Sequence, residues 1–114
     1  MERIIPILEQ ETNLPVKPFG IDSLDECIVY TMVPQTDDGA VQTWRLELRL
    51  ITKTLARADE LKTKILSALV NKGDSQKING ILNCELNGGG CMEDPNGTIH
   101  TLMYLYITEK SEVK

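Results

Sequence analysis

The side chains best suited to acid–base or nucleophilic chemistry are few and scattered in this sequence. His100 is the single histidine, so one chain cannot assemble a multi-histidine metal site or a triad with a second histidine. Cys91 follows a glycine run, but no basic residue stands beside it in the sequence to favour the thiolate. The pattern predicts no catalytic residues. It leaves open a composite enzyme site between subunits, where His100 and acidic groups from different chains converge.

Two acidic pairs fall in expected turns, Asp37-Asp38 and Glu93-Asp94. Paired carboxylates can bind a divalent cation or share a proton. Aspartate is also common in turns because its side chain bonds to the nearby backbone. The turn interpretation is favoured, and we expect neither a metal nor another cofactor.

A glycine triplet, Gly88-Gly89-Gly90, is the next feature that could form a binding site. It does not match a phosphate-binding loop, which needs Lys and Ser or Thr after its last glycine, nor the dinucleotide pattern between strand and helix. We expect it to form a flexible or closely packed loop.

The composition is that of a globular chain and restricts the classes of partner. The 114 residues suit one domain, with 41% hydrophobic and 25% charged residues. The net charge of −5 and the scattered basic residues argue against nucleic-acid binding. No run of about 18–20 apolar residues predicts a membrane span, and no signal-peptide pattern opens the chain. The odd number of cysteines without a CxxC pair favours reduced thiols in a cytosolic protein: Cys27, Cys84 and Cys91.

The spacing of apolar residues, prolines and glycines predicts the helices and strands that would position these residues. Residues 1–20 predict a short helical turn or an extended lead-in, because prolines interrupt them. Cys27–Val33 is an apolar, β-favouring run that ends before Pro34, and Asp37 to Gly39 predict a turn. In Val41–Ile51 the even positions are apolar and the odd ones polar, which indicates a long strand with one buried face.

The second half predicts one helix and two further strands. Apolar residues at spacings of three and four from Leu55 to Leu69 indicate an amphipathic helix, capped by Thr52 or Thr54 and ended near Gly73. Ile78–Asn87 is expected as a strand that the glycine triplet breaks. Asp94 to Gly97 form a turn, Ile99–Thr108 is the last strand, and residues 109–114 form a frayed tail. We expect a single α+β domain over residues 1–114, with a mainly antiparallel sheet of about four strands and one helix packed on one face.

The polar side of the long strand carries alternating charges at Arg45, Glu47 and Arg49. Such a face is normally only solvated. It is also suited to meet a second copy of the chain, where opposite signs would fix the register.

The order of these features resembles a known family. A proline-containing lead-in, Cys27–Val33, the turn at Asp37 to Gly39, the strand Trp44–Ile51 and the helix Ala56–Leu69 precede a glycine-rich excursion and the strand in "DPNGTIHTLMYLYITEK". This arrangement is similar to the small tail-terminator, minor capsid or tail-completion (head-tail joining) proteins of long-tailed bacteriophages and prophages. The resemblance covers most of the chain and rests on arrangement.

The resemblance implies a non-enzymatic structural protein that assembles into a typically hexameric ring, contacting the tail tube and the head connector. Its place would be the bacterial cytoplasm during assembly and then the virion at the head-tail junction. The implied contact regions are the strand Val41–Ile51 and the loop Asn87–Gly97. The candidate interface residues are Arg45, Glu47, Arg49, Gly88, Gly89, Gly90, Asp94 and Asn96. The alternative is a sensor or regulatory domain that binds a small molecule between helix and sheet.

Overall fold

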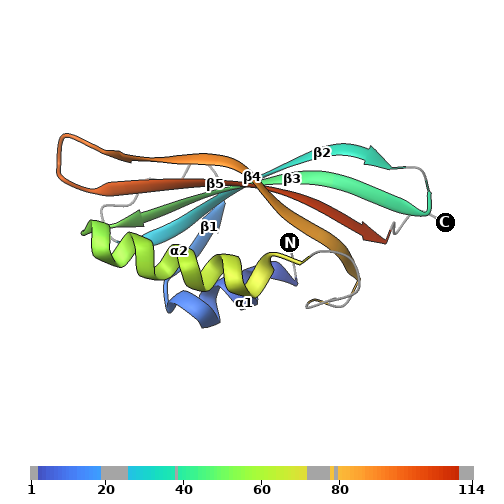
Figure 1. The fold of residues 1–114 in the computed structure, drawn as a ribbon, viewed down its shortest axis with the longest axis horizontal. Coiled ribbons are helices and arrows are strands. Elements are labelled where there is room, and N and C mark those ends of the chain that lie inside the picture. Colours follow the sequence, from blue (N-terminus) through green and yellow to red (C-terminus); the bar gives the residue numbers. More distant parts are fainter. Residues whose placement is uncertain (1–2, 19–25, 38, 72–77, 79, 111–114) are drawn as a thin grey trace.

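The chain folds into a twisted sheet, and the helices α1 and α2 lie on one of its faces (Figure 1). The computed structural model describes residues 3–18, 26–37, 39–71, 78 and 80–110. Its elements are α1 (Ile4–Thr12), β1 (Val16–Pro18), β2 (Cys27–Asp37), β3 (Val41–Thr52), α2 (Leu55–Leu69), β4 (Ile81–Glu93) and β5 (Ile99–Lys110). The strand order is β1-β2-β3-β5-β4, and only β1 pairs in parallel. The expected α+β class is confirmed. The expected four strands and one helix are corrected, because the described residues form five strands in a mixed sheet and two helices.

The first helix forms despite Pro6. Proline is the third residue of α1, in the first turn, where backbone N–H groups have no partner within the helix. Ile4 and Leu8 are fully buried and anchor α1 on the core. The helix ends at Asn13, which adopts the left-handed conformation and donates its N–H to the Glu9 carbonyl oxygen at 2.8 Å.

The additional strand, β1, lies in the segment expected only to be extended chain. It runs parallel to the start of β2, and the Ile28 N–H donates to the Pro15 carbonyl oxygen at 2.9 Å. Pro18 is tolerated because β1 is an edge strand.

The strand β2 continues past Pro34 to Asp37, although a strand end was expected there. The Ile28 N–H points away from β3, so alternation places the N–H positions of Tyr30, Met32 and Pro34 on the same outer side. The missing N–H of Pro34 therefore removes no hydrogen bond to β3. The expected turn at Asp37 to Gly39 includes Asp38, which lies outside the described residues.

The alternation expected in the long strand is confirmed. Leu46, Leu48 and Leu50 of β3 are buried, and β3 is the middle strand of the sheet. Within the helix α2 the Arg57 N–H donates to the Thr54 hydroxyl oxygen at 3.2 Å, so Thr54 is the N-cap. The i,i+4 ion pair Glu60–Lys64 forms at 3.6 Å. The expected helix end at Gly73 lies outside the described residues, and α2 ends at Leu69.

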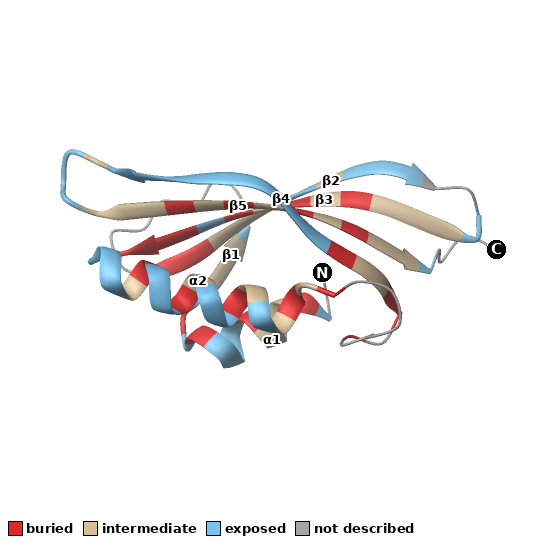
Figure 2. Cartoon of the chain, in the orientation of Figure 1, coloured by how far each residue is buried: buried red, intermediate tan, exposed pale blue. Residues whose placement is uncertain are grey.

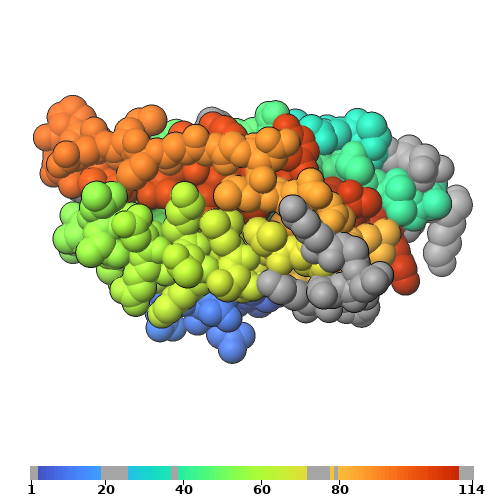
Figure 3. Space-filling model, in the orientation of Figure 1, coloured from blue at the N-terminus to red at the C-terminus, as the bar shows by residue number. Residues whose placement is uncertain are grey.

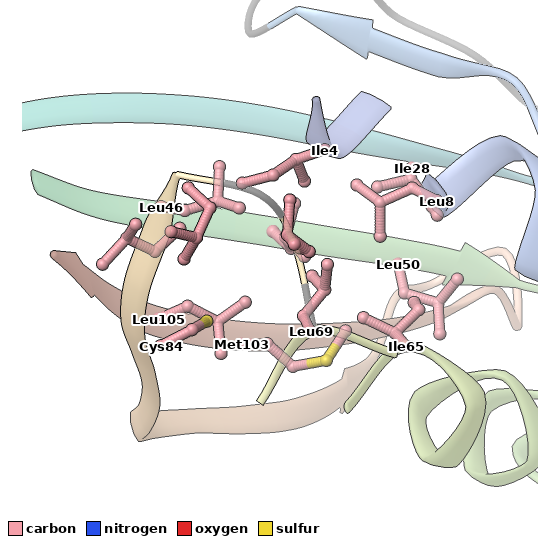
Figure 4. Packing of buried hydrophobic residues seen from close by; sticks show 14 of the residues in the cluster. Ile4, Leu8, Ile28, Leu46, Leu50, Ile65, Leu69, Cys84, Met103 and Leu105 are labelled. Atoms are coloured by element: carbon pink, nitrogen blue, oxygen red, sulfur yellow. The ribbon is translucent and has the colours of Figure 1, made fainter. Parts of the chain in front are cut away.

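The core lies between the helices and the sheet (Figure 4). Leu61, Ile65 and Leu69 of α2 are each no more than 1% exposed, and Met103 and Leu105 of β5 are completely buried. Together with β3 leucines and α1, these side chains form one aliphatic cluster. Burial of such apolar area is the main favourable contribution to folding.

The glycine triplet does not end β4, which corrects the expected break after Asn87 and the expected start at Ile78. The strand begins at Ile81 and continues to Glu93, with a bulge between Leu86 and Gly89. Gly88 and Gly89 have φ of 103° and 149°, which favour glycine, so the triplet supplies a bulge inside a strand.

Residues 86–102, here called the arm, comprise the end of β4, the turn and the start of β5. The arm reaches past the beginning of α2 (Figure 1). Glu85 to Glu93 are all exposed, and this part of β4 appears pale blue in Figure 2. The expected turn at its tip is confirmed, since the Gly97 N–H donates to the Asp94 carbonyl oxygen at 2.9 Å. Among the described residues, no helix has the length and apolar character needed to cross a membrane.

Candidate protein-interaction surface

One face of the sheet has no helix over it (Figure 1). Strand alternation and register place three neighbouring side chains from each of β2, β3 and β5 near the middle of this outer face. They are Val29, Thr31 and Val33 of β2, Arg45, Glu47 and Arg49 of β3, and Leu102, Tyr104 and Tyr106 of β5. All are partly exposed except Arg49, which is exposed. The outer face therefore combines aliphatic, aromatic and charged groups, a composition common at protein interfaces.

Opposite charges on this face pair within the chain. Arg45 contacts Glu47 Oε2 through both Nε, at 3.1 Å, and Nη2, at 2.9 Å. The hydrogen bonds that Arg45 donates to Tyr106 and then to Glu47 raise the pKa of Arg45. The pair is thus already satisfied before any partner arrives. Arg49 is exposed and forms no ion pair with another described residue, so its charge is available to a partner.

The register brings most of the predicted interface residues onto one surface. Arg49 lies beside Leu102, which lies beside Gly90, and Glu47 lies beside Tyr104. A Cβ on Gly88 would lie 3.3 Å from the Tyr104 ring, so Gly88 adjoins the same face. Gly89 pairs with the buried Met103 and faces the opposite side.

Asp94 and Asn96 lie apart from that surface, at the tip of the arm. Asp94 Oδ1 accepts the N–H groups of Asn96 at 2.9 Å and Thr98 at 3.0 Å. Asp94 Oδ2 lies 2.9 Å from His100 Nε2. The hydrogen bond with His100, with smaller effects from the two backbone N–H groups, lowers the pKa of Asp94. Both carboxylate oxygens therefore hold the turn.

The groups suited to chemistry do not converge in this chain. His100 pairs with Met92 on the outer face, whereas Cys91 pairs with Thr101, whose side chain projects from the other face. The Thr101 hydroxyl lies 3.9 Å from the Cys91 sulfur. Within the described part of the chain, no three or more His, Cys, Asp or Glu side chains gather as a metal site would require.

The fold is shared with a component of a virus-like particle. A chain in the solved structure entitled "Virion of native gene transfer agent (GTA) particle" superposes with a TM-score of 0.63. The alignment covers 92% of this chain and 85% of that chain, at 12% sequence identity, so it establishes a common fold. No protein-family model matches the sequence, and no curated protein matches it either.

Sequence reasoning missed two parts of this surface. Tyr104 and Tyr106 of the last strand were not among the predicted interface residues, and they lie on the uncovered face. The exposed edge of β4 was missed because the glycines were expected to break the strand. The signal available was the uncharged stretch around the triplet, residues 86–92.

Proposed function

We propose that this protein is a structural component of a phage-like particle, which ends the tail tube and joins it to the head. It would act by self-assembly into a ring and by contacts with tail-tube and head-connector proteins, with no covalent step. The residues proposed for these contacts are Arg45, Glu47, Arg49, Gly88, Gly89, Gly90, Asp94 and Asn96.

The observation that carries the proposal is the common fold with a chain of the gene transfer agent virion structure, over 92% of the present chain. The order of elements in the sequence independently resembles tail-terminator and head-tail joining proteins. These two lines of support agree on a particle component, and the finer role rests on the sequence resemblance.

The outer face adds physical support for protein contacts. A sheet face that carries Leu102, Tyr104 and Tyr106 without a covering helix leaves aromatic and aliphatic area in water. Interfaces are enriched in tyrosine and arginine, and here Arg49 lies beside Leu102. The alternative, a sensor that binds a small molecule between helix and sheet, gains no support there, because the side chains of that layer form the packed core.

Gene deletion tests the proposal. Removal from the phage or prophage that encodes the protein should leave heads and over-long tails that fail to join, visible by electron microscopy. Re-expression of the wild-type chain should restore joined particles. Normal infectious particles in the deletion strain would refute the proposed function.

A test of the outer face uses matched variants. Arg49→Glu reverses an exposed charge without breaking an ion pair with a described residue, so the chain should fold but restore few joined particles. Lys62→Glu reverses a partly exposed charge on α2 that forms no ion pair with another described residue, and it serves as the control. Equal restoration by both variants would remove Arg49 from the interface.

A further inference from the structure

The sheet has one open edge along the arm. The strand β4 is the last strand of the sheet, and in the described chain its other contact is a single bridge between Asn71 and Cys84. Beyond that bridge, β5 is the only described strand that pairs with the stretch from Leu86 to Glu93. In Figure 3 this part of β4 lies on the surface above α2.

The backbone groups on this edge can be assigned. The Asp94 N–H donates to the Thr98 carbonyl oxygen at 2.9 Å, so Asp94 points toward β5. Because backbone groups alternate along an antiparallel strand, Glu93, Cys91 and Gly89 direct their N–H and C=O groups outward. These form a short row of donors and acceptors suited to another strand.

A second open edge lies on the opposite side of the sheet. β1 pairs only with Ile28, Val29 and Tyr30, so from Thr31 onward no described strand pairs with this side of β2. The Ile28 N–H points away from β3, and every second residue of the strand points the same way. Met32 therefore directs its N–H and C=O groups outward on this edge. Pro34 follows at the next outward position and offers a carbonyl oxygen alone.

Most of each edge lacks the charges that usually protect such edges. Residues 31–36 and 86–92 contain no Asp, Glu, Lys or Arg, in a chain in which 25% of residues are charged. Natural sheets commonly guard exposed edges with charged side chains to prevent pairing. Of the four exposed large hydrophobic residues in the described part of the chain, three lie on these two strands: Met32, Leu86 and Met92.

We propose that β4 of one copy pairs with the open edge of β2 of the next copy, so that the sheet continues from subunit to subunit. This deepens the proposed function, on which it rests, by naming the contact that builds the ring. A copy of the same chain carries both edges, so one head-to-tail contact covers Met32 of one subunit and the Leu86–Met92 stretch of its neighbour. Head-to-tail contacts of this kind form a ring when the rotation between neighbouring subunits closes the circle.

Proline variants test the pairing at single hydrogen-bond positions. Cys91→Pro and Met32→Pro each remove an outward N–H and leave the hydrogen bonds to β5 and β3 in place. Light scattering after size-exclusion chromatography should give an oligomeric mass for the wild type and a single-subunit mass for each variant. The controls are Cys91→Ser and Met32→Leu, which keep the N–H and should keep the oligomeric mass.

A mixture of the two proline variants gives the decisive result. Cys91→Pro keeps an intact β2 edge and Met32→Pro keeps an intact β4 edge, so the mixture should form dimers and nothing larger. If Met32→Pro assembles alone while Cys91→Pro does not, β4 pairs with itself and the proposal is wrong. Oligomers from either variant alone, or a wild-type chain that stays monomeric at every concentration, would also overturn it.

Two further measurements guard against misfolding of the proline variants. Circular dichroism and Trp44 fluorescence should match the wild type, and Cys91→Lys and Met32→Lys, which retain the N–H, should also give monomers.

In the wild-type assembly, amide exchange at Met32, Gly89 and Cys91 should slow by more than about tenfold relative to dilute protein. Unchanged exchange would contradict the pairing. If the variants assemble normally, the pairing of β4 with β2 is refuted. The proposed role in the particle would still be tested separately by gene deletion.

Discussion

At the scale of single residues, Gly89 has the most demanding position in the arm. Its φ of 149° is a conformation that side-chain-bearing residues rarely adopt. A Cβ there would lie 2.2 Å from the Leu102 carbonyl oxygen, which belongs to the backbone and cannot rotate away. Gly90 differs, because a Cβ on it would meet nothing within 4 Å.

Alanine at these neighbouring positions should therefore have different effects. Gly89→Ala is expected to lower the free energy of unfolding by about 1–3 kcal/mol or more, from strain and from displacement of β5. Gly90→Ala should change it by no more than about 0.5 kcal/mol. Urea unfolding measures both. Similar losses in the two variants would contradict the bulge geometry.

Asp94 should contribute to stability in a pH-dependent way. Its pKa is lowered in the fold, so the contribution of its charged form is complete above the unfolded-state value of about 3.8. It is lost as the pH falls through the lower folded-state pKa. Asp94→Asn should be less stable than the wild type at pH 6, and the difference should shrink below about pH 4.

The measurement is urea unfolding of both proteins across this pH range. Asp59→Asn, on the exposed side of α2, is the control and should differ little from the wild type at each pH. A gap between the Asp94→Asn variant and the wild type that stays constant down to pH 2 would refute the role of the charged carboxylate.

At the scale of elements, strongly periodic segments were predictable and proline-containing ones were not. Apolar residues in Val41–Thr52 and Leu55–Leu69 repeat at the periods of strand and helix, so local pattern and burial agree. In α1 and β2 the effect of proline depends on where its missing N–H would point. Pro6 lies in the first turn of α1, and Pro34 lies on the outer edge of β2. The outer side of β2 is recognised from its pairing with β1, and sequence alone does not predict that pairing.

The candidate surface was predictable only within a strand. Alternation placed Arg45, Glu47 and Arg49 on one side of β3. Their neighbours Leu102 and Tyr104 depend on the register with β5, which is fixed by pairing between residues about fifty positions apart. The bulge at Gly88 and Gly89 likewise depends on the close approach of β5.

The beginning of α2 offers a test at the scale of an element. Thr54 accepts the Arg57 N–H through its side chain, and Thr54→Ala leaves that N–H without this partner. The loss should lower the free energy of unfolding by about 1 kcal/mol. Thr54→Ser retains the hydroxyl and should be close to the wild type. Chemical unfolding followed by circular dichroism checks the result, and equal stability of all three proteins would contradict the cap.

At the scale of the whole molecule, Glu109 joins distant parts of the chain. The Trp44 Nε1–H donates to Glu109 Oε1 at 3.0 Å, and Gln42 donates to the same oxygen. Arg3, just before α1, lies 3.8 Å from the other carboxylate oxygen. Glu109 was expected in a frayed tail, yet it belongs to β5 and holds the buried Trp44.

Removal of this acceptor should destabilise the fold. Glu109→Ala leaves the Trp44 N–H without a partner in a buried position, at a cost of about 1–3 kcal/mol. Glu109→Gln keeps an acceptor oxygen and should lose less. Because Trp44 is the single tryptophan, its fluorescence during urea unfolding reports the change directly. Wild-type stability of Glu109→Ala would show that Trp44 finds another acceptor.

The position of β5 has a consequence for synthesis on the ribosome. β5 follows β3 and β4 in the sequence but lies between them in the sheet. In a nascent chain translated only as far as β4, that strand therefore has no partner strand to pair with, and β3 lacks its neighbour β5. Only a chain translated through Lys110 can present an ordered open edge of β4. Translation would thus delay subunit joining until this final strand has emerged, and fragments cut short would be poor competitors for finished molecules.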